Sequence, residues 1–248
     1  MKEKIRLNKY ISNSGICSRR EADKYITAGL ISVNDTIISK LGSKVNENDI
    51  VRFNGQKVNI EKKIYVLLNK PKNYITTTKD PKNRKTVMEL IKNSSKTRLY
   101  PVGRLDRKTT GLLLFTNDGE IAKKLTHPRY KVEKLYHVIL NKNLKKIDYD
   151  LIIKGLNLED GKVFVDELSY ANNKKNELGV KIHIGKNRII RRIFEKLNYN
   201  VIKLDRVMLA GLTKKNLQRG CWRYLNKQEI DFLKMLKKWK NSFIFCYS

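Results

Sequence analysis

Long apolar runs are missing from this sequence of 248 residues, because no stretch of 18 or more consecutive apolar residues occurs. A transmembrane helix needs about 20 such residues, so the sequence predicts no membrane-spanning segment and no membrane partner. The amino-terminal end is charged from residue 2 onward and lacks the apolar core of a secretory signal. These absences predict a cytoplasmic protein.

The usual ligands of metal ions are also scarce, since the sequence has three cysteines and three histidines. The cysteines are far apart and form no Cys-x-x-Cys pair, which argues against a disulfide framework and against a zinc site. The histidines are equally scattered, as ordinary surface or strand residues are, so no metal is expected. The residues concerned are Cys17, Cys221, Cys246, His127, His137 and His183. Because no glycine-rich phosphate loop or dinucleotide fingerprint occurs either, no nucleotide cofactor is predicted.

Acidic residues are few relative to basic ones. Asp and Glu total 24 against 54 Lys and Arg, which gives a formal net charge of +30. Such a charge favours polyanionic partners, with nucleic acid foremost. Part of the lysine excess has another explanation in a biased base composition, because Asn and Ile are abundant as well. The apolar content of 40% is sufficient to fill the cores of one large domain or of a large and a small domain.

A small module of about sixty residues is predicted at the amino terminus. Two short helices come first, and the second begins with the capping-box pattern of Ser18 and Glu21. Alternating strands follow at "ISVN" and "DIVRF", and the second strand meets the hairpin signal Asn54-Gly55. The apolar faces and terminal glycines are Leu7, Tyr10, Ile11 and Gly15 in the first helix and Ala22, Tyr25, Ile26 and Gly29 in the second.

Arg19 and Arg20 occupy the first turn of the second predicted helix, where the helix dipole disfavours cations. A phosphate group bound across this helix end would compensate for them, although an exposed basic helix start without function is the alternative. The segment "RLNKYISNSGICSRREADKYI…GLISVN" resembles the alpha-L RNA-binding motif. The resemblance implies an RNA-binding module over residues 1–60, with Lys9 as a further RNA contact. Asp35 stands where the motif usually has Gly, and Asp tolerates turn dihedrals.

A polar linker at residues 59–63 separates this module from a larger second part. Strands are predicted at "IYVLLNKP", "GLLLFT", "LYHVIL", "KVFV" and "GVKIHI", and helices at "TVMELIKN", "GEIAKKL" and "RIIRRIFEKLN". The irregular alternation of strands and helices favours an α+β domain with a mostly antiparallel or mixed sheet.

Asp106 is a lone carboxylate in the stretch "GRLDRKTTGLLLFTNDG", between Arg104 and Arg107. Neighbouring cations favour the charged form of a carboxyl group, which suits nucleophilic attack or proton abstraction. The alternative at this point is a structural salt bridge that holds a loop. In "GKNRIIRRIFEKLNY", three arginines crowd a helix start opposite an apolar face, and one of them is expected to turn towards a carboxylate. The other two then remain for RNA phosphates; the three are Arg188, Arg191 and Arg192.

The Asp106 stretch resembles the catalytic signature of the ribosomal-RNA pseudouridine synthases, in the branch with an amino-terminal alpha-L module. Further matches follow in order along the chain and together cover nearly all of residues 1–230: "LLNKPKNYITT", "LTHPRYKVEKLYHV" and "GKNRIIRRIFEKLNYNVIKLDRV". The resemblance implies a catalytic domain over residues 64–235, built on a mostly antiparallel mixed sheet with flanking helices. Residues 236–248 are then a basic tail with no assigned role.

Carried over to this sequence, the resemblance implies that Asp106 is the catalytic carboxylate and that Arg104 helps to hold RNA with the target base displaced. Tyr136 is implied to pack against the uracil ring, and Arg191 to form an ion pair with Asp106. The sequence departs from the family pattern at Asn73, where Gly is usual, and at Ile189, where Gln is common.

The implied reaction isomerises a uridine within ribosomal RNA, alone or in a pre-ribosomal particle, and the protein is expected to act as a monomer. Nothing is consumed, so no cofactor is needed. The segment "LTHPRYKVEKLYHV" favours a target in the large subunit. A small-subunit or tRNA synthase and a non-catalytic RNA-binding ribosome-assembly protein remain alternatives. Neither the uridine nor the role of Asp106, attack on C1′ or removal of the 2′ proton, follows from the sequence.

Overall fold

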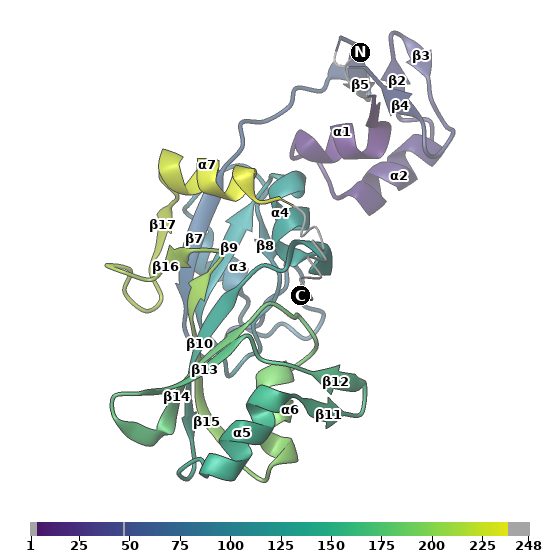
Figure 1. Ribbon diagram of the computed structural model, residues 1–248. Helices are drawn as coiled ribbons and strands as arrows, with labels where there is room; N and C mark the ends of the chain where they lie inside the picture. The colour runs from purple at the N-terminus through teal and green to yellow at the C-terminus, as the bar shows by residue number, and fades with distance from the viewer. Residues whose placement is uncertain (1–3, 47, 238–248) are drawn as a thin grey trace. The chain divides into compact units, whose positions relative to one another are not determined.

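The computed structural model describes residues 4–46 and 48–237, which form two compact units (Figure 1). The first unit comprises the described residues up to Ile64 together with Ser95–Leu99 and Asn117–Gly119. The second unit comprises the remaining described residues. Most of the predicted basic tail, from residue 238 on, lies outside the described part, as does Cys246. No described helix is both long enough and apolar enough to cross a membrane.

The first unit contains the two predicted helices, α1 (Leu7–Asn13) and α2 (Arg19–Thr27). The apolar residues predicted for their inner faces are buried, apart from a half-buried Tyr25. The capping box of α2 is confirmed, because the Ser18 hydroxyl accepts from the Glu21 amide at 3.2 Å and Glu21 accepts from the Ser18 amide at 2.8 Å. Local capping therefore fixes the helix start that carries Arg19 and Arg20.

Short antiparallel strands complete this unit, in a four-stranded sheet of order β3-β2-β5-β6 and a separate pair β1-β4. The predicted turn at Asn54-Gly55 joins β5 to β6, with φ of 47° and 79°. Asp35 adopts a φ of 65° in the β2–β3 turn, so it takes the left-handed conformation that Gly adopts easily. The strands are β1 (Ile5–Arg6), β2 (Ile31–Val33), β3 (Thr36–Ile37), β4 (Lys44–Val45), β5 (Val51–Phe53) and β6 (Gln56–Lys57).

The second unit is built on a nine-stranded sheet, and the predicted α+β class with a mostly antiparallel mixed sheet is confirmed. The main strand order is β13-β14-β10-β15-β9-β7-β17, with β16 paired to β15 and β8 paired to β9. Every pair is antiparallel except β9–β15. The strands are β7 (Tyr65–Lys70), β8 (Tyr100–Val102), β9 (Thr110–Thr116), β10 (Lys134–Leu140), β13 (Glu167–Ala171), β14 (Lys174–Ile182), β15 (Val201–Leu209), β16 (Leu212–Thr213) and β17 (Trp222–Tyr224).

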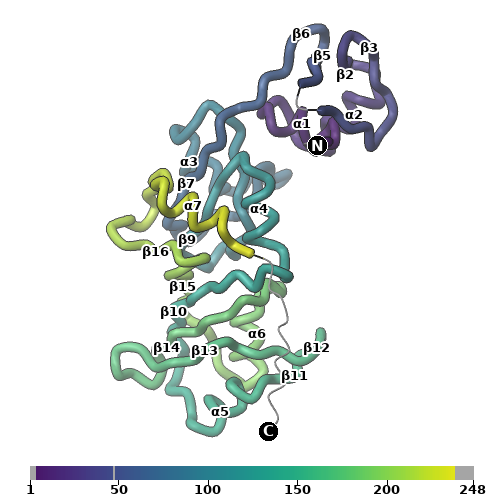
Figure 2. Tube along the Cα trace, turned by 45° about the horizontal axis from the view of Figure 1, so that its top comes forward, coloured from purple at the N-terminus to yellow at the C-terminus, as the bar shows by residue number. Residues whose placement is uncertain are grey.

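The neighbouring strands β7 and β9 form the centre of the core, and all their residues are buried. Apolar side chains of α4 (Gly119–Thr126) and α7 (Lys227–Met235) pack against one face of these strands, through residues such as Ile121, Leu125 and Leu233. The helix α3 (Val87–Ile91) lies in the same part of the unit (Figures 1 and 2). The buried strand β9 thus supplies a rigid support directly after the loop that carries Asp106.

The other end of the second unit holds α5 (Lys146–Lys154), α6 (Ile189–Lys196) and a small hairpin, near β13 and β14 (Figure 2). The hairpin joins β11 (Leu156–Leu158) to β12 (Gly161–Val163) and is separate from the main sheet. The strand predicted at "KVFV" corresponds to β12, which ends at Val163, before the exposed Phe164. The helices α5 and α7 and the strands β8, β11, β13, β15, β16 and β17 were not predicted from the sequence.

Candidate active site

A cavity of about 620 Å³ lies in the second unit, and four of the predicted site residues line it: Arg104, Asp106, Tyr136 and Arg188. Its wall comes from the loop before β9, from β10 and β15, and from the segment between β14 and α6. Residues far apart in sequence thus meet around one space. Ile189, the departure from Gln, is buried and also lines the cavity, where it presents an apolar surface.

Asp106 is exposed in the loop between β8 and β9, and the main chain of this loop is tied down on both sides. The Lys70 ammonium donates to the carbonyl oxygens of Asp106 at 3.1 Å and Thr109 at 2.8 Å, and to that of Pro71 at 3.1 Å. The Thr76 hydroxyl donates to the Leu105 carbonyl at 2.8 Å. The carboxylate therefore projects from a loop whose backbone is held by side chains of the β7 region.

Lys70 is fully buried at the end of β7. Burial lowers the pKa of Lys70 from its ordinary value of 10.5 to about 8, and the Arg219 and Arg206 cations contribute to the decrease while Asp106 opposes it. The charge of Asp106 thus favours the protonated form of Lys70. The role of Lys70 was not predicted from the sequence, in which it is one of many lysines.

Asn73 follows in the same segment and adopts a left-handed φ of 71°. Its amide donates to the Arg107 carbonyl at 2.8 Å. Asn is one of the few residues that tolerate this backbone region, so it supports the turn that the usual Gly would form. The departure at Asn73 therefore leaves the contact with the Asp106 loop intact.

Tyr136 and Arg206 lie opposite each other on the paired strands β10 and β15, and both line the cavity. Both side chains are buried, with exposed fractions of 8% and 3%. Nε of Arg206 donates to the Leu112 carbonyl in β9 at 2.7 Å. An aromatic ring and a guanidinium group thus stand side by side on one face of the sheet, because directly opposed residues share a face.

The predicted direct ion pair between Asp106 and Arg191 is not formed among the residues described. Nη1 of Arg191 instead donates to the Val201 carbonyl at 2.9 Å. Burial lowers the pKa of Arg191, and the neighbouring Arg188 cation lowers it further, whereas Asp106 opposes the shift. The Arg191 guanidinium is thus anchored to β15, and the charge of Asp106 favours its protonated form.

Two other arginines of this segment have carboxylate partners. Arg188 donates to Glu195 at 3.1 Å, and Arg192 forms a bidentate pair with Asp160 at 3.0 and 2.6 Å. Arg192 thereby ties α6 to the β11–β12 hairpin. Lys186 donates to the Asp160 carbonyl at 2.7 Å and strengthens the same link.

Lys134 is a further cation of the cavity wall that the sequence analysis missed. Its ammonium donates to the carbonyls of Val132 and His183, both at 2.9 Å. Burial lowers the pKa of Lys134 to about 8, Arg206 adds to this decrease, and Asp166 opposes it. Asp166 itself pairs with Nδ1 of His183 at 2.6 Å.

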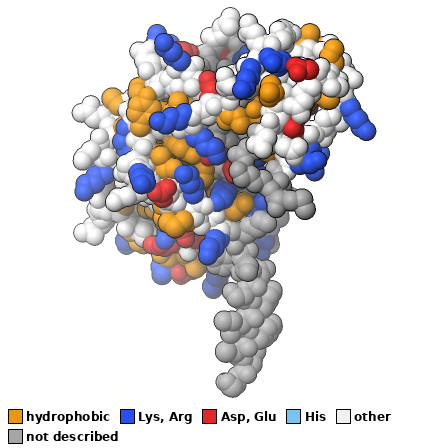
Figure 3. Space-filling model, turned by 90° about the horizontal axis from the view of Figure 1, so that it is seen from above, with side chains coloured by type: hydrophobic (Ala, Val, Ile, Leu, Met, Phe, Trp, Pro, Cys, Tyr) orange, Lys and Arg blue, Asp and Glu red, His pale blue; other side chains and the backbone are white. Residues whose placement is uncertain are grey.

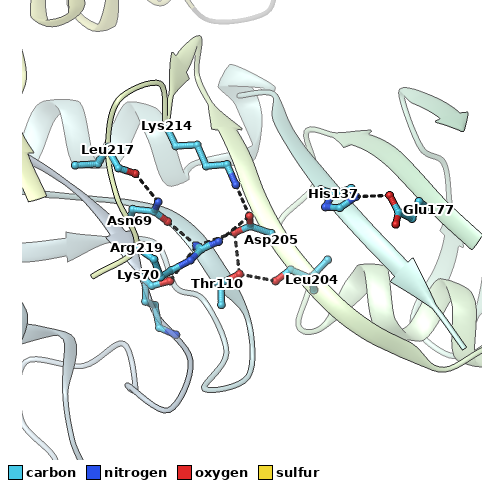
Figure 4. A network of polar contacts seen from close by, with 10 residues as sticks. All are labelled: Asn69, Lys70, Thr110, His137, Glu177, Leu204, Asp205, Lys214, Leu217 and Arg219. Carbon is cyan, nitrogen blue, oxygen red and sulfur yellow. Dashed lines mark hydrogen bonds and ion pairs between the residues drawn. The ribbon is translucent and has the colours of Figure 1, made fainter. Parts of the chain in front are cut away.

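A network of polar contacts around the buried Asp205 joins β15 to the start of β9 and the end of β7 (Figure 4). Arg219 donates to both carboxylate oxygens of Asp205 at 2.9 Å, Thr110 donates at 2.8 Å, and Lys214 is a third donor. Burial alone raises the pKa of Asp205, but the hydrogen bonds from these three residues outweigh burial and hold the pKa well below its ordinary range. The same Arg219 also donates to Asn69 beside Lys70.

The predicted RNA contacts of the first unit lie on its helices. Arg19 and Arg20 are exposed at the start of α2, and Arg19 donates to the Asn8 side chain at 3.3 Å. Lys9 is half-buried on α1. Lysine and arginine side chains are spread over the face seen in Figure 3, with fewer acidic side chains among them. Across the described part of the chain, no group of three or more His, Cys, Asp or Glu could hold a metal ion.

Comparison with known proteins adds an independent finding. A family profile described as RNA pseudouridylate synthase matches residues 64–196, and the S4 domain profile matches residues 5–51. Ribosomal large subunit pseudouridine synthase B of Bacillus subtilis (strain 168) is 39% identical over 235 residues, covering 93% of this chain and 96% of the relative. The protein of the same name from Buchnera aphidicola subsp. Baizongia pistaciae (strain Bp) is 38% identical over 238 residues, covering 92% and 96%. A solved pseudouridylate synthase structure covers 92% of this chain and 99% of its own, with a TM-score of 0.65 and 25% identity.

Proposed function

The chain belongs to the RNA pseudouridylate synthase family, and on this premise we propose that it converts a uridine of ribosomal RNA to pseudouridine with Asp106 as the catalytic carboxylate. The observation that carries the proposal is the cavity in which Asp106 and Tyr136 meet, although thirty residues separate them in the chain. The large-subunit relatives, of nearly equal length, support ribosomal RNA of the large subunit as the substrate.

The reaction moves one glycosidic bond. The N1–C1′ bond of uridine breaks, the uracil turns, and C5 bonds to C1′ while the hydrogen of C5 is lost and N1 gains one. Atoms and electrons balance within the nucleotide and water, so the proposal includes no cofactor. Asp106 acts either on C1′ as a nucleophile or on the 2′ proton as a base, and both roles use the carboxylate anion.

The other residues hold the RNA in place. A base inside folded RNA must be unstacked before it enters a pocket, which costs a few kcal/mol. Stacking on Tyr136 offsets this cost, because base–aromatic stacking contributes about 1–3 kcal/mol. Arg104 and Arg188 are exposed at the cavity and suit RNA phosphates, with Arg192 as a further basic residue of this segment. In this proposal Arg191 acts on Asp106 through space.

We propose that residues 1–60 bind RNA through Lys9, Arg19 and Arg20, and that residues 64–235 carry the reaction. The S4 profile match supports the first assignment. A monomer in the cytoplasm is the state in which such an enzyme meets ribosomal RNA or a pre-ribosomal particle. Small-subunit RNA, tRNA and RNA binding without catalysis are the alternative outcomes of the following experiment.

Pseudouridines are mapped in total RNA from cells with and without this gene, and the gene is restored as wild type, Asp106→Asn or Asp150→Asn. We expect one large-subunit pseudouridine to disappear with the gene, to return with wild type and with Asp150→Asn, and to stay absent with Asp106→Asn. Asp150 is a matched control, since it pairs with Lys146 on α5, away from the cavity lining. The Asp106→Asn protein should still bind RNA. A site restored by Asp106→Asn would disprove the catalytic assignment, and a changed site in tRNA or small-subunit RNA would redirect the substrate.

A further inference from the structure

Arg206 is a buried cation with an unused donor. Only 3% of its surface is exposed, and Nε is bonded to the Leu112 carbonyl. Nη2 is shielded from solvent and has no acceptor among the described residues. A buried donor without a partner costs about 1–3 kcal/mol, and more for a charged group. Arg206 also forms no ion pair with a carboxylate in the part of the chain that the structure describes, so a buried cation lines the cavity without a counter-charge, and this indicates that an acceptor enters from outside the chain.

The position of Arg206 limits what this acceptor is. Arg206 is opposite Tyr136 across the β10–β15 ladder, and both line the cavity with Asp106. Its charge also lowers the pKa of Lys70 and of Lys134. In contrast, the exposed Arg104 and Arg188 offer their guanidinium groups to solvent. Phosphates fit the exposed arginines, whereas the buried Arg206 fits a group that enters the cavity beside the aromatic ring.

We propose that Arg206 is a further catalytic residue, whose guanidinium group donates a hydrogen bond to a carbonyl oxygen of the target uracil. The proposal rests on the proposed function. When the N1–C1′ bond breaks, its electron pair leaves with the uracil and is shared by O2 and O4. The Arg206 guanidinium keeps its protons and stabilises this charge. The pair then forms the C5–C1′ bond, the C5 proton passes to water, and N1 receives a proton from water. Donors fixed in advance at developing charge are effective because they need no reorganisation during the reaction.

The experiment measures single-turnover rates on an RNA fragment that contains the mapped uridine, or 2-thiouridine or 4-thiouridine at that position. Sulfur is a weaker hydrogen-bond acceptor than oxygen, and we expect the weaker hydrogen bond to outweigh the stabilisation that sulfur gives to the base anion. If Arg206 donates to O2 or O4, the corresponding thio substitution should slow the wild-type enzyme by about tenfold, in keeping with the loss of one charge-assisted hydrogen bond. If neither thio substitution slows the wild-type enzyme, the proposal is overturned without any variant.

The variants Arg206→Gln and Arg206→Lys complete the test. We expect the rate on uridine RNA to fall by about 10²–10³-fold, as when one donor to developing charge is removed, with RNA affinity retained. The decrease in rate on thio-substituted RNA relative to uridine RNA, here called the thio effect, should be smaller in both variants, because they lack the guanidinium donor that bonds to this position. A purely structural role would leave the ratio of rates on thio and ordinary RNA unchanged, which would refute the proposal.

Arg223→Gln is the matched control, because Arg223 is a half-buried arginine that pairs with Glu229 at 2.6 and 2.8 Å, away from the cavity lining. It should keep both the wild-type rate and the wild-type thio effect. Thermal unfolding of each variant checks the fold, and the wild-type thio effect decides the case if both Arg206 variants unfold. A wild-type enzyme inactive on every RNA would contradict the proposed function, whereas an active enzyme with no thio effect contradicts only the role of Arg206.

Discussion

Lys70 is a single buried residue that holds the backbone of the Asp106 loop. Its three donors match three main-chain carbonyls, two of them in the Asp106 loop. An ammonium group without water is costly to bury, and the lowered pKa of about 8 reflects this cost. Lys70 thus serves to position the Asp106 loop and does not raise the net stability of the protein at neutral pH.

The lowered pKa of Lys70 makes the free energy of unfolding depend on pH in a defined direction. Between pH 8 and 10.5 the unfolded chain binds more protons at this lysine than the folded chain, so its part of the free energy of unfolding rises with pH. The full shift corresponds to at most about 3 kcal/mol. In Lys70→Met, the increase in stability from pH 8 to pH 10 should be smaller than in wild type, measured by denaturant unfolding. Lys123→Met, at an exposed position on α4, should keep the wild-type increase; equal increases in all three proteins would contradict the assignment.

At the scale of elements, the one parallel pair of the sheet joins the two strands that carry the site. The start of β9 pairs with the middle of β15 at Thr110–Asp205 and Gly111–Arg206. A Cβ atom at Gly111, whose φ is 105°, would lie 2.2 Å from the Arg206 carbonyl oxygen. Only Gly allows this approach of the two backbones, because the neighbouring atom belongs to the main chain and cannot move aside.

Gly111→Ala should therefore separate β9 from β15. We expect a loss of at least about 2 kcal/mol in the free energy of unfolding, from a side chain forced against backbone and from a strained φ. Activity should fall with it, because Arg206 and the Asp106 loop are displaced relative to each other. The measurement is denaturant unfolding, with Gly185→Ala as the control for stability, since a Cβ atom there meets nothing within 4 Å. A Gly111→Ala protein as stable as this control would disprove the role of the close approach.

At the scale of the whole molecule, the net charge of +30 dominates the approach to RNA. Affinity for a polyanion falls with salt because each neutralised phosphate releases counterions. Arg19 and Arg20 lie on α2 of the first unit, whereas the cavity residues belong to the second, and we expect the two arginines to contribute to this attraction. Binding and chemistry should accordingly respond to different substitutions.

The double variant Arg19→Ala/Arg20→Ala should bind RNA about tenfold more weakly at low salt, and the slope of log Kd against log salt should decrease by up to about two. The rate constant at saturating RNA should stay at the wild-type value. Lys57→Ala, an exposed cation on β6 of the same unit, should alter the slope by less than half as much. A double variant with unchanged affinity and slope would show that these arginines do not bind RNA.

The sequence alone determined the features that depend on local chemistry. The capping box of α2, the Asn54-Gly55 turn and the buried strands β7 and β9 follow from neighbouring residues, and so does the class of the sheet. The long signature around Asp106 was sufficient to identify the family. Such features are readable because the physical cause and the residue lie within a few positions of each other.

Only the tertiary structure decided which distant residues serve the site. The strand β15 was not predicted, because Asp205 and Arg206 are charged yet buried and an alternating apolar pattern does not reveal such residues. The partner of Asp205 is Arg219, fourteen residues away, and the partner of Arg206 is the Leu112 carbonyl, ninety-four residues away. In the sequence, nothing distinguishes Lys70 from an exposed lysine, and only the fold places main-chain carbonyls around its ammonium group. A charged residue can be buried at low free-energy cost only when it has polar partners. Partners on neighbouring strands are determined by the sheet topology and not by the spacing of residues in the sequence. The anchoring of Arg191 to Val201, in place of the predicted ion pair with Asp106, has the same origin.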